Sequence, residues 1–284
     1  MLTRRAESSP KNVPIAPSIP PASVDSPSLL VTLVNHSTVL LQQPGSNILT
    51  DPVWSARCGP FGLAGPRRHR LPGVEFDRLP PIHAVLLSHN HYDHLDLTTL
   101  RRLAARGGSQ FVVPLGVARL LESQGVGPVR ELDWGDSLDV PGATVHAVPA
   151  LHFSARGLFD RNRTLWCGYL VESAFGKIYF AADTGFGPHF AWIRERFGAP
   201  RVALLPIGAY EPRWFMSPIH MNPEDAVEAH RILGASTSIA IHHGTFQLSD
   251  EAIDTPRRRL LACAPADSFL TLDNGQFARF DSRS

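Results

Sequence analysis

The sequence has few cysteines, almost no lysine and no long apolar run. Its three cysteines, Cys58, Cys167 and Cys263, are widely spaced among 284 residues. This spacing argues against a disulfide framework and for a reducing compartment. No run approaches 18 apolar residues, so we expect no membrane-spanning segment and a cytoplasmic location. Lysine occurs only at Lys11 and Lys177, beside 25 arginines, which indicates a compositional bias and no function.

An excess of one charge is also missing. The chain has 27 basic and 26 acidic side chains and a net charge of +1, without the basic surplus of a general nucleic-acid binder. We therefore expect no nucleic-acid partner. A chain of this length forms one large or two small domains, and it buries enough surface to fold without a disulfide or structural zinc.

The amino-acid composition divides the chain into two parts. Residues 1–28 hold six prolines among serines and alanines and predict a flexible, proline-rich N-terminal arm. Residues 29–284 alternate apolar runs with helical patterns, which predicts one α/β domain. The predicted strands are Leu30–Leu41, His83–Leu87, Gln110–Pro114, Ala143–Pro149, Leu165–Glu172, Lys177–Ala182, Val202–Pro206 and Ser238–Ile241. The predicted helices are Asp96–Arg106, Gly116–Gln124, Pro188–Phe197, Pro223–Leu233 (capped by Asn222) and Thr255–Cys263.

A dense group of metal-ligand residue types follows the strand predicted at residues 83–87. His89, His91, Asp93 and His94 form the pattern H-x-H-x-D-H. Imidazole and carboxylate are the usual nitrogen and oxygen ligands of zinc and similar metals. In an extended segment His89 and His91 point the same way, whereas the next two residues lie at a turn and face a second point. One ion cannot easily use all four, but two can. The alternative, polar residues at a helix N-terminus, fits a lone histidine better than this run.

Three later strands also end in a ligand residue type. These residues are His152, Asp183 and His242. Along the chain, 58 residues separate His94 from His152, 31 separate His152 from Asp183, and 59 separate Asp183 from His242. These gaps are long enough for each to arrive on its own strand. Together the seven residues supply five histidines and two aspartates for a two-metal site.

These motifs resemble the metallo-β-lactamase superfamily. The resemblance rests on the H-x-H-x-D-H run, the later histidine, the Ala-Asp-Thr-Gly at residues 182–185 and the final histidine. It implies an α/β fold, a four-layer αββα sandwich with two mixed sheets flanked by helices and a dinuclear metal site between the sheets. Longer blocks resemble N-acyl-phosphatidylethanolamine-hydrolysing phospholipase D: Leu49–Cys58, Ser88–Asp96, Pro206–Met216 and Ile241–Phe246.

The resemblance also implies roles for individual residues. One metal takes His89, His91 and His152, the other takes Asp93, His94 and His242, and Asp183 bridges them. Zinc is the default for such ligands, and iron or manganese also fits. Tyr92 and His220 are expected to hold substrate, and Asp93, Asp183 and His220 to be catalytic. Phe153 and His243 stand where the phospholipase has tryptophan, which changes the expected shape of the substrate groove.

The implied activity is that of a metal-dependent hydrolase. The resemblance favours a phospholipase D-type phosphodiesterase acting on N-acyl-phosphatidylethanolamine or a related glycerophospholipid through a metal-bridging hydroxide. The same hydroxide would serve a metal-dependent lactonase or a small-molecule phosphodiesterase, and the ligands do not distinguish carbon from phosphorus. A degenerate member that only binds a ligand or partner would have lost metal ligands, whereas all seven are present.

Residues near the ligands are expected to support them. His36 is predicted to lie behind the site, since seven ligands are already assigned, and Asp51 and Asp96 are candidates for orienting a ligand imidazole. Cys58 is expected to be packed rather than reactive.

Two loops bear on the substrate and on partners. Arg156–Arg163 and Phe61–Arg70 each place apolar residues among arginines, which suits the boundary between acyl chains and anionic headgroups. The alternative is an ordinary solvated loop. We expect a phospholipid or another small-molecule ester as substrate and peripheral membrane contact. The arm and the apolar loops are also compatible with a homodimer.

Overall fold

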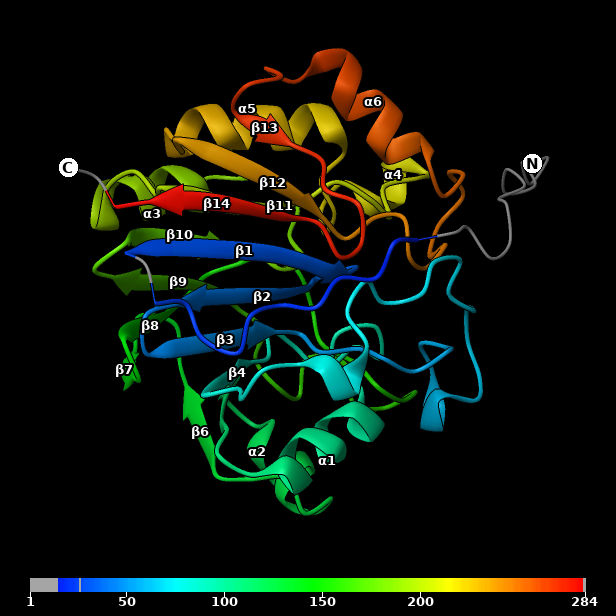
Figure 1. The fold of residues 1–284 in the computed structure, drawn as a ribbon. Coiled ribbons are helices and arrows are strands. Elements are labelled where there is room, and N and C mark those ends of the chain that lie inside the picture. Colours follow the sequence, from blue (N-terminus) through cyan, green and yellow to red (C-terminus); the bar gives the residue numbers. More distant parts are fainter. Residues whose placement is uncertain (1–14, 26, 283–284) are drawn as a thin grey trace.

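A computed structural model of the chain describes residues 15–25 and 27–282. Two mixed sheets of seven strands each form its centre (Figure 1). In spatial order, the first sheet contains β14 (Phe277–Asp281), β1 (Ser28–Asn35), β2 (Thr38–Gln43), β3 (Ser46–Thr50), β4 (Ala84–Leu86), β5 (Gln110–Pro114) and β6 (Val129–Leu132). The second contains β13 (Phe269–Leu270), β12 (Thr237–Ile241), β11 (Val202–Pro206), β10 (Gly176–Phe180), β9 (Gly168–Ser173), β8 (Ala143–Val148) and β7 (Ser137–Val140). In each sheet one half is antiparallel and the other is parallel. The parallel halves are β3 to β6 in the first sheet and β10 to β13 in the second.

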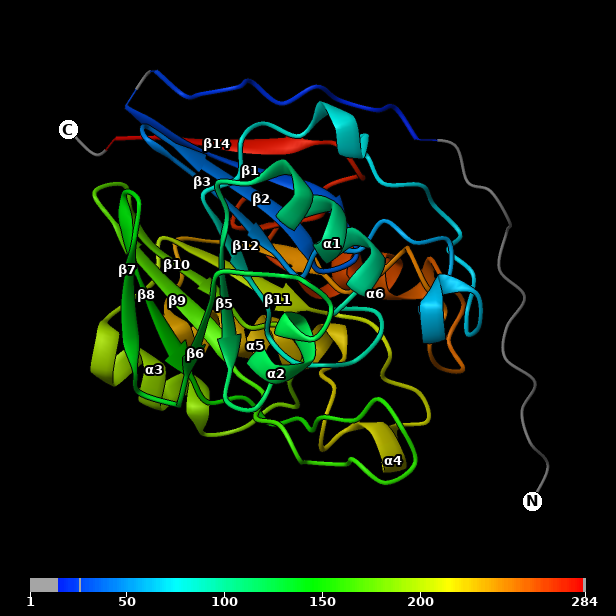
Figure 2. The ribbon, with the colours of Figure 1, turned by 90° about the horizontal axis from the view of Figure 1, so that it is seen from below.

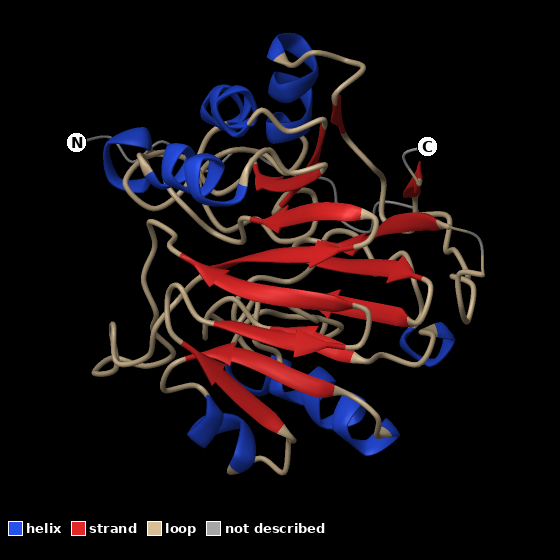
Figure 3. Cartoon of the chain, turned by 90° about the vertical axis from the view of Figure 1, so that its left-hand side faces the viewer, coloured by secondary structure: helices blue, strands red, loops and turns tan. Residues whose placement is uncertain are grey.

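Helices cover the outer face of each sheet, so the molecule has the four αββα layers that the sequence predicts (Figure 3). α1 (Leu97–Arg106) and α2 (Ala118–Glu122) pack on the first sheet. α3 (His189–Phe197), α5 (Pro223–Leu233) and α6 (Thr255–Cys263) pack on the second. α4 (Arg213–Met216) and the 3-10 turns η1 (Pro60–Gly62) and η2 (Phe76–Arg78) lie in connections. Among the described residues, no helix combines the length and apolar character that crossing a membrane requires.

The inner strands are buried because each sheet has apolar contacts on both faces. In β11, Leu204 points into the core between the sheets, whereas Ala203 and Leu205 point to the helices. Alternate side chains of a strand face opposite ways, so such a strand is apolar throughout. The second sheet is thereby fixed between two cores, and the ends of its strands are held in place for the site.

Part of the predicted arm lies beside the first sheet. Residues 15–25 contain no helix or strand, and the chain enters β1 at Ser28. The Ser18 amide donates to the Gly73 carbonyl (2.8 Å), and the Gln42 side chain donates to the Pro21 carbonyl (2.8 Å). Residues 1–14 and 26 lie outside the described part of the chain. The flexibility of the arm and the boundary at residues 28 and 29 stay predictions.

Most predicted elements are present, but one long strand was predicted wrongly. The run Leu30–Leu41 is a hairpin, β1 and β2, which turns at His36 with φ of 47°. The sequence hid this turn because histidine replaces the glycine that usually takes positive φ. The predicted bounds of β5, β11, α5 and α6 agree with the structure, and Asn222 caps α5 through a capping box with Asp225. Six elements of five residues or fewer have no counterpart among the predicted ones: β3, β6, β7, β13, β14 and α4.

Candidate metal centre

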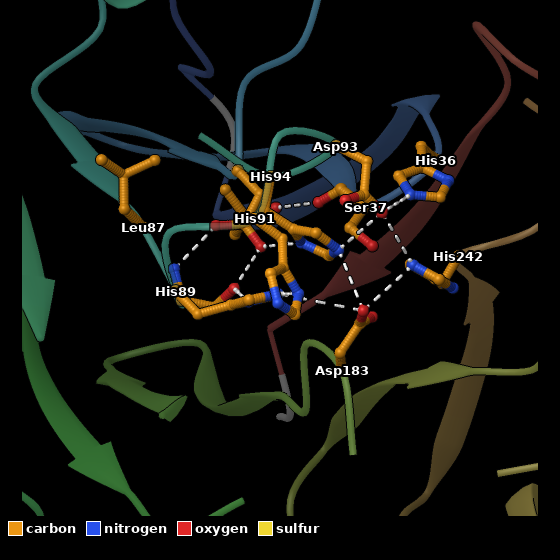
Figure 4. Close-up of polar contacts among 12 residues, drawn as sticks. His36, Ser37, Leu87, His89, His91, Asp93, His94, Asp183 and His242 are labelled. Atoms are coloured by element: carbon orange, nitrogen blue, oxygen red, sulfur yellow. Dashed lines mark hydrogen bonds and ion pairs between the residues drawn. The ribbon is translucent and has the colours of Figure 1, made fainter. Parts of the chain in front are cut away.

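The predicted ligands meet at the ends of strands from both sheets (Figure 4). The loop after β4 carries the H-x-H-x-D-H run, and His152, Asp183 and His242 follow β8, β10 and β12. The residues after the carboxyl ends of these strands come together, and loops at such ends commonly form ligand sites. The structure therefore brings all seven predicted ligands together.

The backbone turns sharply where these strands end. Four residues beside the site that are not glycine adopt positive φ: His36 (47°), Asp51 (32°), Ala182 (53°) and His242 (56°). Such conformations cost energy for residues with a Cβ, and they persist where the surrounding structure enforces them. Three of these turns place the side chains of His36, Asp51 and His242 at the site, and the turn at Ala182 directly precedes Asp183.

One half of the site is a group of three histidines. His89 Nε2 lies 2.9 Å from His91 Nδ1, and His152 Nε2 lies 3.2 Å from the same atom. Asp183 Oδ2 lies 4.0 Å from His89 Nε2 and 3.7 Å from His152 Nε2. The three nitrogens and this oxygen surround a common point.

The other half combines two histidines with Asp93. Oδ2 of Asp93 lies 3.3 Å from Nε2 of both His94 and His242. Asp183 Oδ2 lies 3.1 Å from each of the same two nitrogens. The Asp183 carboxylate therefore stands between the two halves, in the place expected for a bridging ligand.

Hydrogen bonds behind the histidines leave lone pairs facing the centre. Ser88 Oγ donates to the Asp51 carboxylate (2.6 Å), so it accepts from His89 Nδ1 (2.8 Å). His152 Nδ1 likewise donates to the Ile219 carbonyl (3.1 Å). Both rings, when neutral, therefore turn a bare Nε2 inward. Converging lone pairs repel one another unless a cation lies between them, so these residues fit a divalent metal such as zinc, iron or manganese.

The two halves differ in how they hold protons. Burial lowers the pKa of His89, His91 and His152, so the first half is neutral at pH 7. Burial also opposes charge on His94 and His242. The neighbouring carboxylates outweigh it, raising the pKa of His94 well above its usual value and that of His242 to about 9.

The two carboxylates are ionised. Burial alone would raise the pKa of Asp93 and Asp183, but the adjacent histidines hold both well below the usual range. The site therefore presents two negative charges toward its centre, which suits a pair of cations.

His36 and Asp51 support the ligands from behind. Burial lowers the pKa of His36 to about 3, and its neutral ring donates from Nε2 to Asp93 Oδ2 (3.0 Å). Asp51 accepts from His94 Nδ1 (2.6 Å) and from the amide of Ser88 (2.7 Å). Asp96, the other candidate for this role, instead caps α1 and accepts from the amides of residues 54 and 55. Ser88, which links Asp51 to His89, was not among the predicted supporting residues.

His220 lies at the edge of the ligand group. Its ring stacks on that of His242, with the ring centres 5.4 Å apart and an angle of 25° between the planes, and its Nδ1 lies 4.0 Å from Asp183 Oδ2. Within the described part of the chain, this Nδ1 has no hydrogen-bond partner. Burial lowers the pKa of His220 to about 4, so the ring is neutral at pH 7. Its substrate contact stays a prediction.

Arg156 fastens the ligand loop to the loop at residues 153–163. Its Nη1 donates to the carbonyls of Asn90 and Leu95, both at 2.8 Å, and its guanidinium lies 3.9 Å from the centre of the Tyr92 ring. The Tyr92 hydroxyl donates to the Arg156 carbonyl (3.0 Å). Tyr92 therefore joins the two loops, and its predicted contact with substrate stays a prediction.

Cys58 is buried, and burial raises the pKa of its thiol. The structure agrees with the expected packing role, because a protonated buried thiol is a poor nucleophile.

Comparison with known sequences points to one family. The family described as "Beta-lactamase superfamily domain" matches residues 46–243. The N-acyl-phosphatidylethanolamine-hydrolyzing phospholipase D 1 of Caenorhabditis elegans is 38% identical over 266 residues, covering 87% of this chain and 75% of that protein. The uncharacterized protein Rv0906 of Mycobacterium tuberculosis is 44% identical over 245 residues, 84% of this chain. The alignment covers 65% of that relative, so the chain spans slightly less than two thirds of its length.

Solved structures share the fold. The metallo hydrolase Igni18 of the archaeon Ignicoccus hospitalis superposes with a TM-score of 0.66 over 90% of this chain and 100% of its own. Its sequence identity is 20%, so this likeness shows the fold alone.

The two halves should bind metal with different pH dependence. A variant lacking His89 and His91 retains the half whose two histidines hold protons. Zinc must displace both protons, so its affinity should rise by up to about a hundredfold per pH unit from 6.5 to 8.5. A variant lacking Asp93 and His94 retains the first half, which is already neutral, and should change much less over that range. Competition with a chelating dye measures both. Equal pH slopes in the two variants would contradict this assignment of protons.

Arg156 should matter for metal affinity although it is no ligand. Arg156→Gln removes two hydrogen bonds that hold the ends of the ligand loop, so zinc affinity should fall about 10–100-fold. Arg163→Gln is the matched control, because it removes the same charge from an exposed position on the same loop. Competition titration of zinc compares the two variants. If both bind zinc as the native chain does, Arg156 does not position the ligands.

Proposed function

The chain belongs to the β-lactamase superfamily and is a metal-dependent hydrolase of the metallo-β-lactamase fold, and we propose that it is a phospholipase D-type phosphodiesterase. The proposed substrate is N-acyl-phosphatidylethanolamine or a related glycerophospholipid. The observation that carries this proposal is the similarity to the C. elegans phospholipase over 87% of the chain. A stretch of that length includes every site residue from Asp51 to His242.

We propose that the seven ligands hold two divalent ions, with zinc as the default. His89, His91 and His152 would hold one, Asp93, His94 and His242 the other, and Asp183 both. Bound there, the ions would lower the pKa of coordinated water toward 7 and neutralise charge on the phosphoryl oxygens.

Asp93 is suited to orient the attacking water. Its side chain is 13% exposed, whereas that of Asp183 is 2% exposed, so Asp93 faces the open side of the site. His36 and His242 hold its Oδ2 at 3.0 and 3.3 Å, which fixes the carboxylate relative to the substrate space. A low pKa keeps this carboxylate ionised and able to accept a hydrogen bond from water.

His220 is suited to bind the phosphodiester. Its neutral ring offers one N–H donor, and its Nδ1 lies beside the Asp183 carboxylate. Because its pKa is about 4, the His220 ring is not protonated at pH 7 and cannot act as a general acid. We therefore assign its N–H a hydrogen bond to the phosphate. Water then attacks phosphorus, the bond from phosphorus to the ethanolamine oxygen breaks, and that oxygen takes a proton from water. The products are phosphatidic acid and N-acylethanolamine.

Mass spectrometry of N-acyl-phosphatidylethanolamine in detergent micelles tests this function. The metal-loaded native chain should release N-acylethanolamine and phosphatidic acid. Asp183→Asn should lower the rate at least about hundredfold, because it weakens the ligand between the two halves. Asp139→Asn is the control, since Asp139 is exposed and its side chain bonds only to Thr144 in the contacts described.

Each other outcome is informative. Unchanged turnover and metal content in Asp183→Asn would refute the proposed ligand scheme. No lipid product from a native chain with two bound ions would refute the lipid phosphodiesterase, and a lactone or a smaller phosphodiester would then be the substrate to assay.

A further inference from the structure

Six large apolar side chains stand in solvent on three connections. Their exposed fractions run from 59% for Phe215 to 92% for Leu158. We call them the apolar rim: Phe61 and Leu63 at η1, Leu158 and Phe159 in the loop at residues 153–163, and Trp214 and Phe215 in α4. Single exposed apolar residues are normal, but paired ones on several neighbouring loops indicate an interaction surface.

The apolar rim lies at the end of the molecule that carries the metal centre. The loop at residues 153–163 begins directly after His152, and α4 ends four residues before His220. Residues of η1 and Arg156 line one hollow of about 180 Å³ beside Tyr92. In both Figure 1 and Figure 2, α4 and the light-blue turn η1 lie at the right-hand end of the sandwich. The three connections thus share the end of the molecule that carries the ligands.

Positive charge accompanies the apolar rim. Four exposed arginines flank two of its three parts: Arg57, Arg67, Arg161 and Arg163. The segments 55–74 and 153–163 together carry a net charge of +6, although the whole chain has +1. Within this total, Arg68 is buried and Arg70 pairs with Asp254, so the four exposed arginines supply the charge at the surface. The one acidic residue of the two segments, Asp160, is turned to the backbone, where it accepts from the Gly157 amide (2.8 Å). This arrangement is complementary to a surface with apolar and anionic groups.

Hydrogen bonds fix the backbone of the two loops that expose Phe61, Leu158 and Phe159. Arg156 binds the ligand loop, and Asp160 caps the turn below Leu158 and Phe159. At η1, the Cys58 amide donates to the Pro66 carbonyl (3.1 Å), and the Arg57 side chain donates to the Gly65 carbonyl (2.8 Å). Fixed tips lose little conformational freedom on binding, which favours their use as a contact surface.

We propose that the apolar rim docks this protein on an anionic lipid bilayer, with the metal centre facing the headgroups. The inference deepens the proposed function, because it explains how a substrate anchored in a bilayer would reach the site. A second copy of the chain fits the rim less well: a two-fold contact would bring its exposed arginines against their own copies.

Flotation with lipid vesicles tests the docking. The full chain is mixed with vesicles of phosphatidylcholine and phosphatidylglycerol (7:3), and with vesicles of phosphatidylcholine alone. We expect binding to the mixed vesicles that weakens several-fold without phosphatidylglycerol and in high salt. The double variant Leu158→Ser/Phe159→Ser should lower the partition coefficient about tenfold or more, because it removes two apolar side chains from the contact.

A second variant of the apolar rim and one control variant complete the experiment. Trp214→Ser/Phe215→Ser should weaken binding in the same direction from a different segment. Trp192→Ser is the control, since this exposed residue lies on α3, at the opposite end in Figures 1 and 2. It should bind within about twofold of the native chain.

The proposal is overturned by native protein that does not float, or by rim variants that bind as the native chain does. It is also overturned by a native dimer that the rim variants convert to monomers, since the rim would then be a subunit interface. The vesicles contain no N-acyl-phosphatidylethanolamine, the proposed substrate, and the flotation assay measures binding and not hydrolysis. Failure of docking and failure of the proposed activity are therefore separate results.

Discussion

The hydrogen bonds of the Asp51 carboxylate are the constraint on which the metal centre depends. This fully buried group accepts from the amide and hydroxyl of Ser88 and from His94 Nδ1. Burial raises its pKa, and the contacts with His94 and Ser88 oppose that rise by favouring the charged form. Through these contacts it fixes the ring of His94 directly and, through Ser88, the ring of His89. The Asp51 carboxylate, which lies behind the ligands, thus fixes the ring orientation of one histidine in each half of the site.

The site also requires that the two sheets be packed together. The H-x-H-x-D-H loop follows β4 of the first sheet, whereas His152, Asp183 and His242 follow strands of the second. The apolar core between the sheets positions both groups, and neither sheet alone holds a complete half. A metal that binds only the packed state would in turn stabilise it.

The chemistry of the site was more predictable than its support. Seven ligand residues could be found because they follow apolar runs, and a strand end is visible in sequence as the place where such a run stops. The hairpin at His36 could not be found, since its positive φ is enforced by tertiary contacts and no glycine marks it. Arg156 looked like one more cation in an apolar loop, yet it binds carbonyls 61 and 66 residues away along the chain. Contacts of that kind depend on the folded arrangement and leave no local pattern. The edge strands β6, β7 and β14 are partly exposed and lack the apolar runs that marked the inner strands.

Anomalous X-ray diffraction at the zinc edge, from crystals of the zinc-loaded protein, is the most direct test of the central claim. We expect two peaks about 3.5–4 Å apart. One should lie among His89, His91 and His152, the other among Asp93, His94 and His242, with Asp183 touching both. A single peak, or peaks away from these side chains, would contradict this claim.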